Sequence, residues 1–157
     1  MLFRSTAQDP AIIGNGDWDK GGVTGFIFAY EYNSPGTYKS RIYSTSSKTD
    51  ATKMTHAVNE WQNYVLSFDD ENKQMLIYCN GEKIRTLDYA SGADCENTKY
   101  SLKLGNDGTG SYKQNKSIDY SFVIDNFMVT SSLLTEDEIK YLNESQPAPI
   151  QIGKAHV

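Results

Sequence analysis

The sequence has no uninterrupted apolar run that approaches the roughly 20 residues needed to cross a bilayer. It also has little positive charge, with 15 Lys and Arg against 20 Asp and Glu, and no run of Lys or Arg reaches three residues. Because a basic face is what neutralises a phosphate backbone, nucleic acid and an anionic membrane surface are poor partners. The 157 residues fit a single domain.

The N-terminal end of the sequence lacks the pattern of a secretion signal, and the C-terminal end lacks the pattern of a regular secondary-structure element. The first residues have no apolar core of about 7–15 residues, which a secretion signal carries. This leaves a cytosolic protein or a piece of a longer protein, and we favour the piece. The last residues contain Pro147 and Pro149 without periodicity, so we expect a domain over 1–145 and a tail or linker over 146–157.

Catalytic motifs are missing as well. There is no nucleophile-elbow, zinc-protease or Walker-type motif and no glycine-rich dinucleotide-binding pattern. The chain has two histidines and no nucleophile partnered with either. We therefore expect that the protein is not an enzyme.

Cysteine is scarce. Cys79 and Cys95 lie sixteen residues apart, and a metal site of cysteines would need further Cys or His ligands at short spacing. Two interpretations stay open, a disulfide between Cys79 and Cys95 or two inert buried thiols. A disulfide would indicate an oxidising compartment.

Short strands separated by turns dominate the pattern. Asn80-Gly81 between two alternating runs indicates a hairpin with a type I′ turn, since both turn positions need a positive φ. Residues 45–53 read as a polar loop, and Trp61 is expected in the core. Strands are expected over residues 25–32, 41–44, 61–68, 74–79, 82–87, 100–104 and 117–130.

One helix is expected near the C-terminal side. Thr135 can cap it and Glu138 can reach back to the cap, which makes a capping box, and the helix runs about two turns to Leu142. Many short strands with one late helix predict an all-β fold, an antiparallel two-sheet sandwich.

Four stretches, in order, resemble the laminin G-like, concanavalin A-like lectin/glucanase jelly-roll domains of secreted and cell-surface proteins. The resemblance covers about residues 8–142 and implies a jelly roll, commonly binding glycans or proteins and often holding a structural calcium ion. The family's leading strands have no counterpart, which leaves a sheet edge open for an oligomer. The stretches are residues 9–18 with Gly25-Phe26, Trp61 with residues 76–82, Leu104-Gly105, and residues 124–129 with 133–139.

Calcium is the ion that the acidic loops could hold, because it takes oxygen ligands from carboxylates, amides and carbonyls. Asn15, Asp17 and Asp19 offer side-chain oxygens at alternate positions, and the resemblance adds Asp125 from its closing strand. The alternative is plain turn chemistry, in which these side chains bond to nearby backbone.

Sugar binding would use aromatic faces that stack on a pyranose, together with polar side chains for the hydroxyls. The alternative for each aromatic residue is packing in the core or on the sheet. The candidate ligand-binding residues are Trp18, Arg41, Tyr43, Asn106, Asp107 and Tyr112.

Glycan-cleaving enzymes of this fold place carboxylates two and four residues apart along one strand, and the sequence has no such cluster. Asp119 and Asp125 are six residues apart, about 20 Å along a strand. The favoured function is a non-catalytic, lectin-like carbohydrate-binding module of a secreted, periplasmic or cell-surface protein. The alternative is a structural or protein-adhesion module. The expected partner is accordingly a glycan or a neighbouring protein domain.

Overall fold

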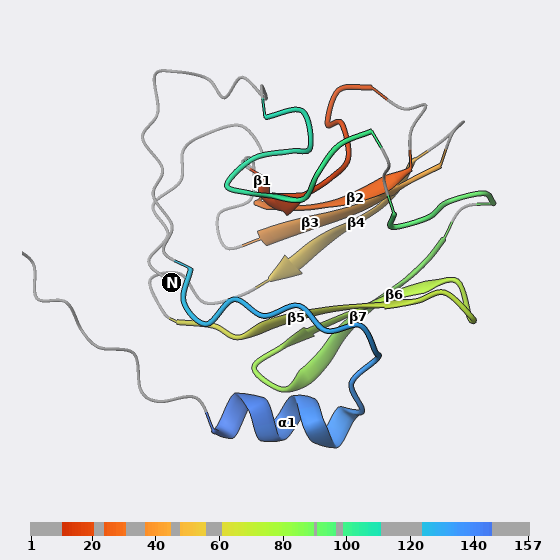
Figure 1. Ribbon diagram of the computed structural model, residues 1–157. Coiled ribbons are helices and arrows are strands. Elements are labelled where there is room, and N and C mark those ends of the chain that lie inside the picture. Colours follow the sequence, from red (N-terminus) through yellow and green to blue (C-terminus); the bar gives the residue numbers. More distant parts are fainter. Residues whose placement is uncertain are drawn as a thin grey trace, which may run out of the picture.

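A computed structural model describes residues 11–20, 24–30, 37–44, 48–55, 61–89, 91–96, 99–110 and 124–145. Within these ranges, eight strands form two antiparallel sheets that lie in layers, with one helix beneath them (Figure 1). The predicted all-β, two-sheet antiparallel sandwich with one short helix is confirmed. The five-stranded sheet has the order β4-β3-β2-β1-β8 and the three-stranded sheet the order β5-β6-β7. The strands of the larger sheet are β1 (Ala11–Gly14), β2 (Gly25–Tyr30), β3 (Thr37–Tyr43), β4 (Lys48–Thr55) and β8 (Lys103–Leu104).

The main core lies between the sheets. Phe28, Tyr38 and Tyr64 form an aromatic triangle that joins the layers, with ring centroids 5.0 Å apart for Phe28–Tyr38 and Tyr38–Tyr64 and 5.3 Å for Phe28–Tyr64. Phe26 meets Phe68 of the other sheet at 4.5 Å. Period-two alternation places these rings on the inner faces of the two sheets.

The smaller sheet is the predicted hairpin extended by one strand: β5 (Tyr64–Asp69), β6 (Gln74–Cys79) and β7 (Glu82–Asp88). Asn80 and Gly81 have φ of 51° and 82°, so the predicted turn with two positive φ angles is confirmed. The register pairs Tyr64 with Cys79 at one end of β5–β6 and Asp69 with Gln74 at the other.

Helix α1 (Glu136–Glu144) lies beside the three-stranded sheet, opposite the larger sheet (Figure 1). Thr135 accepts the Glu138 N–H, and Glu138 accepts the Thr135 N–H at 2.8 Å, so the predicted capping box is confirmed. Ile139 is fully buried. Lys83 of β7 bonds Glu136 at 2.8 Å, which lowers the pKa of Glu136 below its usual range.

Three predictions of local structure are wrong. The sequence predicts a polar loop over residues 45–53, but these residues contain most of β4. This edge strand is polar in composition and is held by pairing with β3. Trp61 is 40% exposed because β5 begins only at Tyr64. Residues 124–130 are not a strand, and the earlier part of that expected strand, with residues 146–157, lies outside the described residues.

Ile139→Ala should lower the free energy of unfolding by about 2–4 kcal/mol, because it removes the side chain that α1 buries. Tyr141→Ala on the same helix should change it by less than about 0.5 kcal/mol, since Tyr141 is 70% exposed. Urea denaturation of both variants measures the difference. Equal losses would mean that α1 is not docked through Ile139.

Candidate functional site

The candidate site lies on the outer face of the five-stranded sheet, away from the main core. On β2 and β3, every second residue points outward, and Ile27 pairs with Arg41 and Gly25 with Tyr43. The loop that follows β1 adds Trp18, which packs with Ile27 and Tyr43 in a second buried cluster. We call Trp18, Lys39, Arg41, Tyr43 and Asp107 the outer-face site.

Trp18 is the centre of the outer-face site. The guanidinium carbon of Arg41 lies 4.3 Å from the centroid of the Trp18 ring, and Lys39 Nζ lies 5.7 Å from it. Arg41 Nη1 also donates a hydrogen bond to the Trp18 carbonyl at 3.2 Å. Both cations thus lie within cation–π range of one indole, with Trp18 and Arg41 themselves buried.

Asp107 fastens a second loop to Trp18. Its Oδ2 accepts the backbone N–H of Trp18 at 3.0 Å. Its Oδ1 accepts the backbone N–H groups of Thr109 and Gly110 and the Thr109 hydroxyl. Gly16 links the first loop to both neighbours. Its N–H donates to the Phe26 carbonyl in β2, and its carbonyl accepts the Gly108 N–H in the second loop. The two loops therefore form one rigid unit on the sheet.

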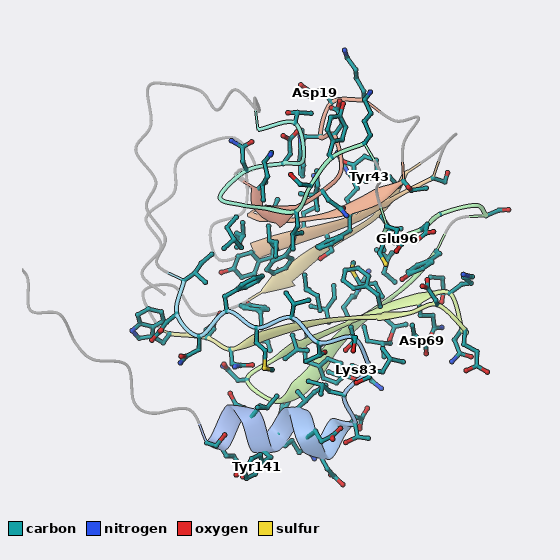
Figure 2. The ribbon with its side chains drawn as sticks, in the orientation of Figure 1. Asp19, Tyr43, Asp69, Lys83, Glu96 and Tyr141 are labelled. Atoms are coloured by element: carbon teal, nitrogen blue, oxygen red, sulfur yellow. The ribbon has the colours of Figure 1, made fainter. Side chains whose placement is uncertain are left out.

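Close backbone approach explains the glycines of this unit. A Cβ on Gly16 would lie 2.7 Å from the Tyr43 ring, and one on Gly108 would lie 2.5 Å from the Asn15 carbonyl oxygen. Contacts this short require the neighbours to move. Tyr43, buried beneath the loop, is shown below Asp19 in Figure 2.

The predicted calcium ligands Asn15, Asp17 and Asp19 lie in the first loop. Asp17 Oδ1 accepts the N–H groups of Asp19 and Lys20, both at 3.1 Å, and Asn15 Oδ1 accepts the Phe26 N–H at 2.8 Å. Asn15 also donates to the Cys95 carbonyl. The Asp17 bonds are the turn chemistry that the sequence offered as the alternative, whereas Asn15 bonds backbone groups 11 and 80 residues away. Calcium stays a prediction.

The structure does not bring Asp125 to this loop. The segment that contains it runs beside the three-stranded sheet, in light blue in Figure 1. Asp125 itself is exposed and accepts the N–H of Asn126 at 2.9 Å. Trp18, Arg41, Tyr43 and Asp107, by contrast, come together from three separate segments. Asn106 adjoins them and accepts the Asp107 N–H, whereas Tyr112 lies outside the described residues.

Sequence reasoning missed Lys39 and Tyr100. Lys39 shares the outer face with Arg41 because the two are two residues apart on β3, and this spacing was the available signal. Tyr100 donates to Asp17 Oδ2 at 3.5 Å, and Lys99 lies 5.1 Å from the Tyr100 ring. No local sequence pattern could have predicted the role of Tyr100, since its hydrogen bond to Asp17 joins residues 83 apart in the sequence.

The disulfide between Cys79 and Cys95 is not formed, and both cysteines are free. Cys79 pairs with Tyr64 at one end of β6, whereas Cys95 lies beside Asp70, past the other end. Five residue steps along β6 span about 17 Å, far beyond the reach of an S–S bond. Of the alternative, two inert buried thiols, the structure has the two separate thiols, but both are half-buried.

Trp18, Arg41, Tyr43 and Asp107 are buried, so the groups that the outer-face site presents to a ligand are the Lys39 ammonium and the polar side chains beside it. The carboxylates of Asp17 and Asp107 accept hydrogen bonds from loop backbone, so their role in the described structure is to hold the loops. Lys39, Asn106 and Thr109 are half-buried, and Asp19 and Lys20 are exposed at the edge of the loops. Such an arrangement suits recognition of a polar ligand by its shape and charge.

Fold and site together define a two-sheet β-sandwich with a loop-built recognition surface. A family model described as the concanavalin A-like lectin/glucanases superfamily matches residues 2–140, and the chain belongs to this family. The family that the sequence resembles is therefore confirmed. No curated protein matches the chain in sequence. Among the described residues, no helix is long and apolar enough to cross a membrane.

Solved structures with the same fold include a carbohydrate-binding module, CBM40, of a Ruminococcus gnavus IT-sialidase. The module bound to α2,3-sialyllactose has a TM-score of 0.57 and 19% sequence identity, covering 90% of this chain and 78% of the module. A second structure of the module has a TM-score of 0.54 and 18% identity, covering 90% and 79%. At 18–19% sequence identity, the structural similarity shows that the fold is shared.

Asp107→Asn should lower the free energy of unfolding by about 2–3 kcal/mol, because an amide cannot accept all four hydrogen bonds that the carboxylate accepts. Asp19→Asn, at an exposed position of the first loop, should change it by less than about 0.5 kcal/mol. Urea denaturation followed by tryptophan fluorescence tests both. Equal unfolding midpoints for the two variants would contradict the role given to Asp107.

Proposed function

We propose that the chain is a non-catalytic carbohydrate-binding module whose ligand contacts the outer-face site. The observation that carries the proposal is the half-buried Lys39 ammonium beside the buried Trp18–Arg41 pair, held by two loops on the outer face of a sheet. Membership of a lectin/glucanase family supports it, as does the fold shared with carbohydrate-binding modules.

We propose further that the ligand is a glycan ending in an acidic sugar. The chain is acidic as a whole, with a formal charge of −5, yet Lys39 and Arg41 gather at one aromatic residue. Complementary charge of this kind selects a partner with a negative group. The module of similar fold bound α2,3-sialyllactose, whose terminal sugar carries a carboxylate, and this supports the choice.

The absence of catalysis is part of the proposal. Retaining glycoside hydrolases need two carboxylates about 5–5.5 Å apart, one of them able to exchange a proton with the leaving group. Asp17 and Asp107 accept hydrogen bonds from the backbone of their own loops, an arrangement that supports a structural role. A binding module of this type would act as part of a longer secreted or surface protein.

The alternative, a protein-adhesion module, is favoured by one observation. Several large apolar side chains around residues 124–133 are exposed, and such groups mark protein contacts when they adjoin. Under this alternative, the chain self-associates or captures a protein partner, and light scattering detects the self-association. The exposed residues are Ile124, Phe127, Met128, Val129 and Leu133.

Isothermal titration should show binding of α2,3-sialyllactose and weaker binding of lactose, because only the former carries a carboxylate. Lys39→Gln should weaken sialyllactose binding about five- to tenfold, the loss expected for one ammonium–carboxylate contact. The matched control is Arg85→Gln, which removes one positive charge from exposed β7 of the other sheet and should leave binding unchanged.

Two outcomes would overturn parts of the proposal separately. If a broad glycan array and the titrations show no binding to any sugar, the carbohydrate-binding function is wrong. If neutral glycans bind as well as sialylated ones, or if Lys39→Gln behaves like Arg85→Gln, the choice of an acidic sugar at the outer-face site is wrong.

A further inference from the structure

Three metal-ligating side chains meet at one end of the sandwich, away from the outer-face site. Asp70, Asp94 and Cys95 each offer one ligand atom, and the three atoms lie within 4.8 Å of one another. We propose that these residues bind a divalent cation of the zinc class that links the two sheets. We call them the sheet-end cluster. The proposal is independent of glycan binding.

The fold brings the cluster together from both sheets. Asp70 follows Asp69 at the end of β5, in the turn of the smaller sheet. Asp94 is tied to the larger sheet, because its N–H bonds the Tyr43 carbonyl at 3.3 Å and its carbonyl accepts the Gly25 N–H at 2.7 Å. Figure 2 shows Asp69 and Glu96, the chain neighbours of Asp70 and Cys95, at this end of the sandwich.

The cluster is oriented before any ion binds. Asn15 Nδ2 donates to the Cys95 carbonyl at 2.9 Å, and Asp94 Oδ1 accepts the Glu96 N–H at 2.9 Å. These bonds fix the backbone of Cys95 and the direction of the Asp94 carboxylate. Binding an ion therefore requires movement mainly of Asp70, which is exposed.

A buried hydroxyl also lies at the cluster. Tyr89 Oη is inaccessible to solvent and lies beside the Cys95 thiol, which is a weak hydrogen-bond partner. A thiolate accepts a hydrogen bond better than a thiol does, so an ion that holds Cys95 deprotonated would satisfy this hydroxyl.

The charges around Cys95 also favour a cation. The carboxylates of Asp70 and Asp94 both place an oxygen within 4.8 Å of Cys95 Sγ, which concentrates negative charge where an ion would bind. Lys73 Nζ lies 3.7 Å from Asp70, but this pair is exposed and weak, so a divalent ion can displace it. Binding of the ion replaces the proton on Cys95 Sγ, and one proton is released to solvent.

The donor set selects the class of ion. A thiolate is a ligand for zinc and related transition metals, whereas calcium and magnesium take oxygen ligands. Two carboxylates and one thiolate provide three of the four ligands of a tetrahedral site, which leaves the fourth for water. This ion and this place differ from the calcium ion predicted at Asn15, Asp17, Asp19 and Asp125.

Cobalt titration of the reduced protein tests the proposal, because Co²⁺ bound by a thiolate absorbs through charge transfer and through visible d–d bands. Wild-type protein should develop both, and added Zn²⁺ should abolish them. Cys95→Ser should lose the charge-transfer band and bind Zn²⁺ more than tenfold more weakly. Cys79→Ser, the matched control, should keep the band and bind Zn²⁺ within about twofold of wild type.

Asp70→Asn gives a second test at an exposed position that carries little risk to folding. It should weaken zinc binding about tenfold, as loss of one ligand does, and Zn²⁺ should raise the melting temperature of wild type and Cys79→Ser more than that of Cys95→Ser. The proposal is overturned if no charge-transfer band forms, if the band persists in Cys95→Ser, or if Asp70→Asn binds Zn²⁺ like wild type.

Discussion

Alternation of side chains across β3 is the constraint on which the rest of the structure depends. Tyr38 and Ile42 point to the smaller sheet, where the aromatic triangle with Phe28 and Tyr64 joins the layers. Each such aromatic pair adds about 0.5–1.5 kcal/mol to the burial of its rings. A slip of one residue would place every inward side chain of β3 on the outer face. The core therefore fixes the register, and the register fixes the outer face.

The outer-face site follows from this constraint rather than from a dedicated motif. Arg41 and Tyr43 point outward because their neighbours on β3 point inward, and Lys39 joins them by the same period. Trp18 adds an aromatic ring from a loop 23 residues before Arg41, and only the folded chain brings that ring to β3. Asp107 then holds the Trp18 loop from a segment 89 residues away. A site built on a fixed strand and two tied loops would meet the proposed ligand already ordered, which would limit the entropy lost on binding.

The parts of the fold that depend on neighbouring residues could be predicted from the sequence, and the parts that depend on distant ones could not. Asn80-Gly81 specifies its turn through φ, and Thr135 specifies its helix through a hydrogen bond three residues away. The sequence did not predict β4, because pairing with β3, and not its own polar sequence, makes it a strand. The separation of Cys79 from Cys95 follows from the length of β6, which a spacing of sixteen residues does not reveal.

The same limit applies to the carboxylates, whose roles depend on how many donors the fold gives them. Asp107 accepts four hydrogen bonds and Asp17 accepts two from backbone N–H groups, so these acids stabilise loops. Asp70 is exposed, has Lys73 3.7 Å away, and lies beside a second carboxylate and a thiol. A carboxylate whose oxygens are occupied by N–H donors has few lone pairs left for a cation, whereas one that faces other anions gains most from binding one. The balance of donors therefore separates the loop-holding acids from the acids proposed to bind a metal more sharply than their spacing in the sequence.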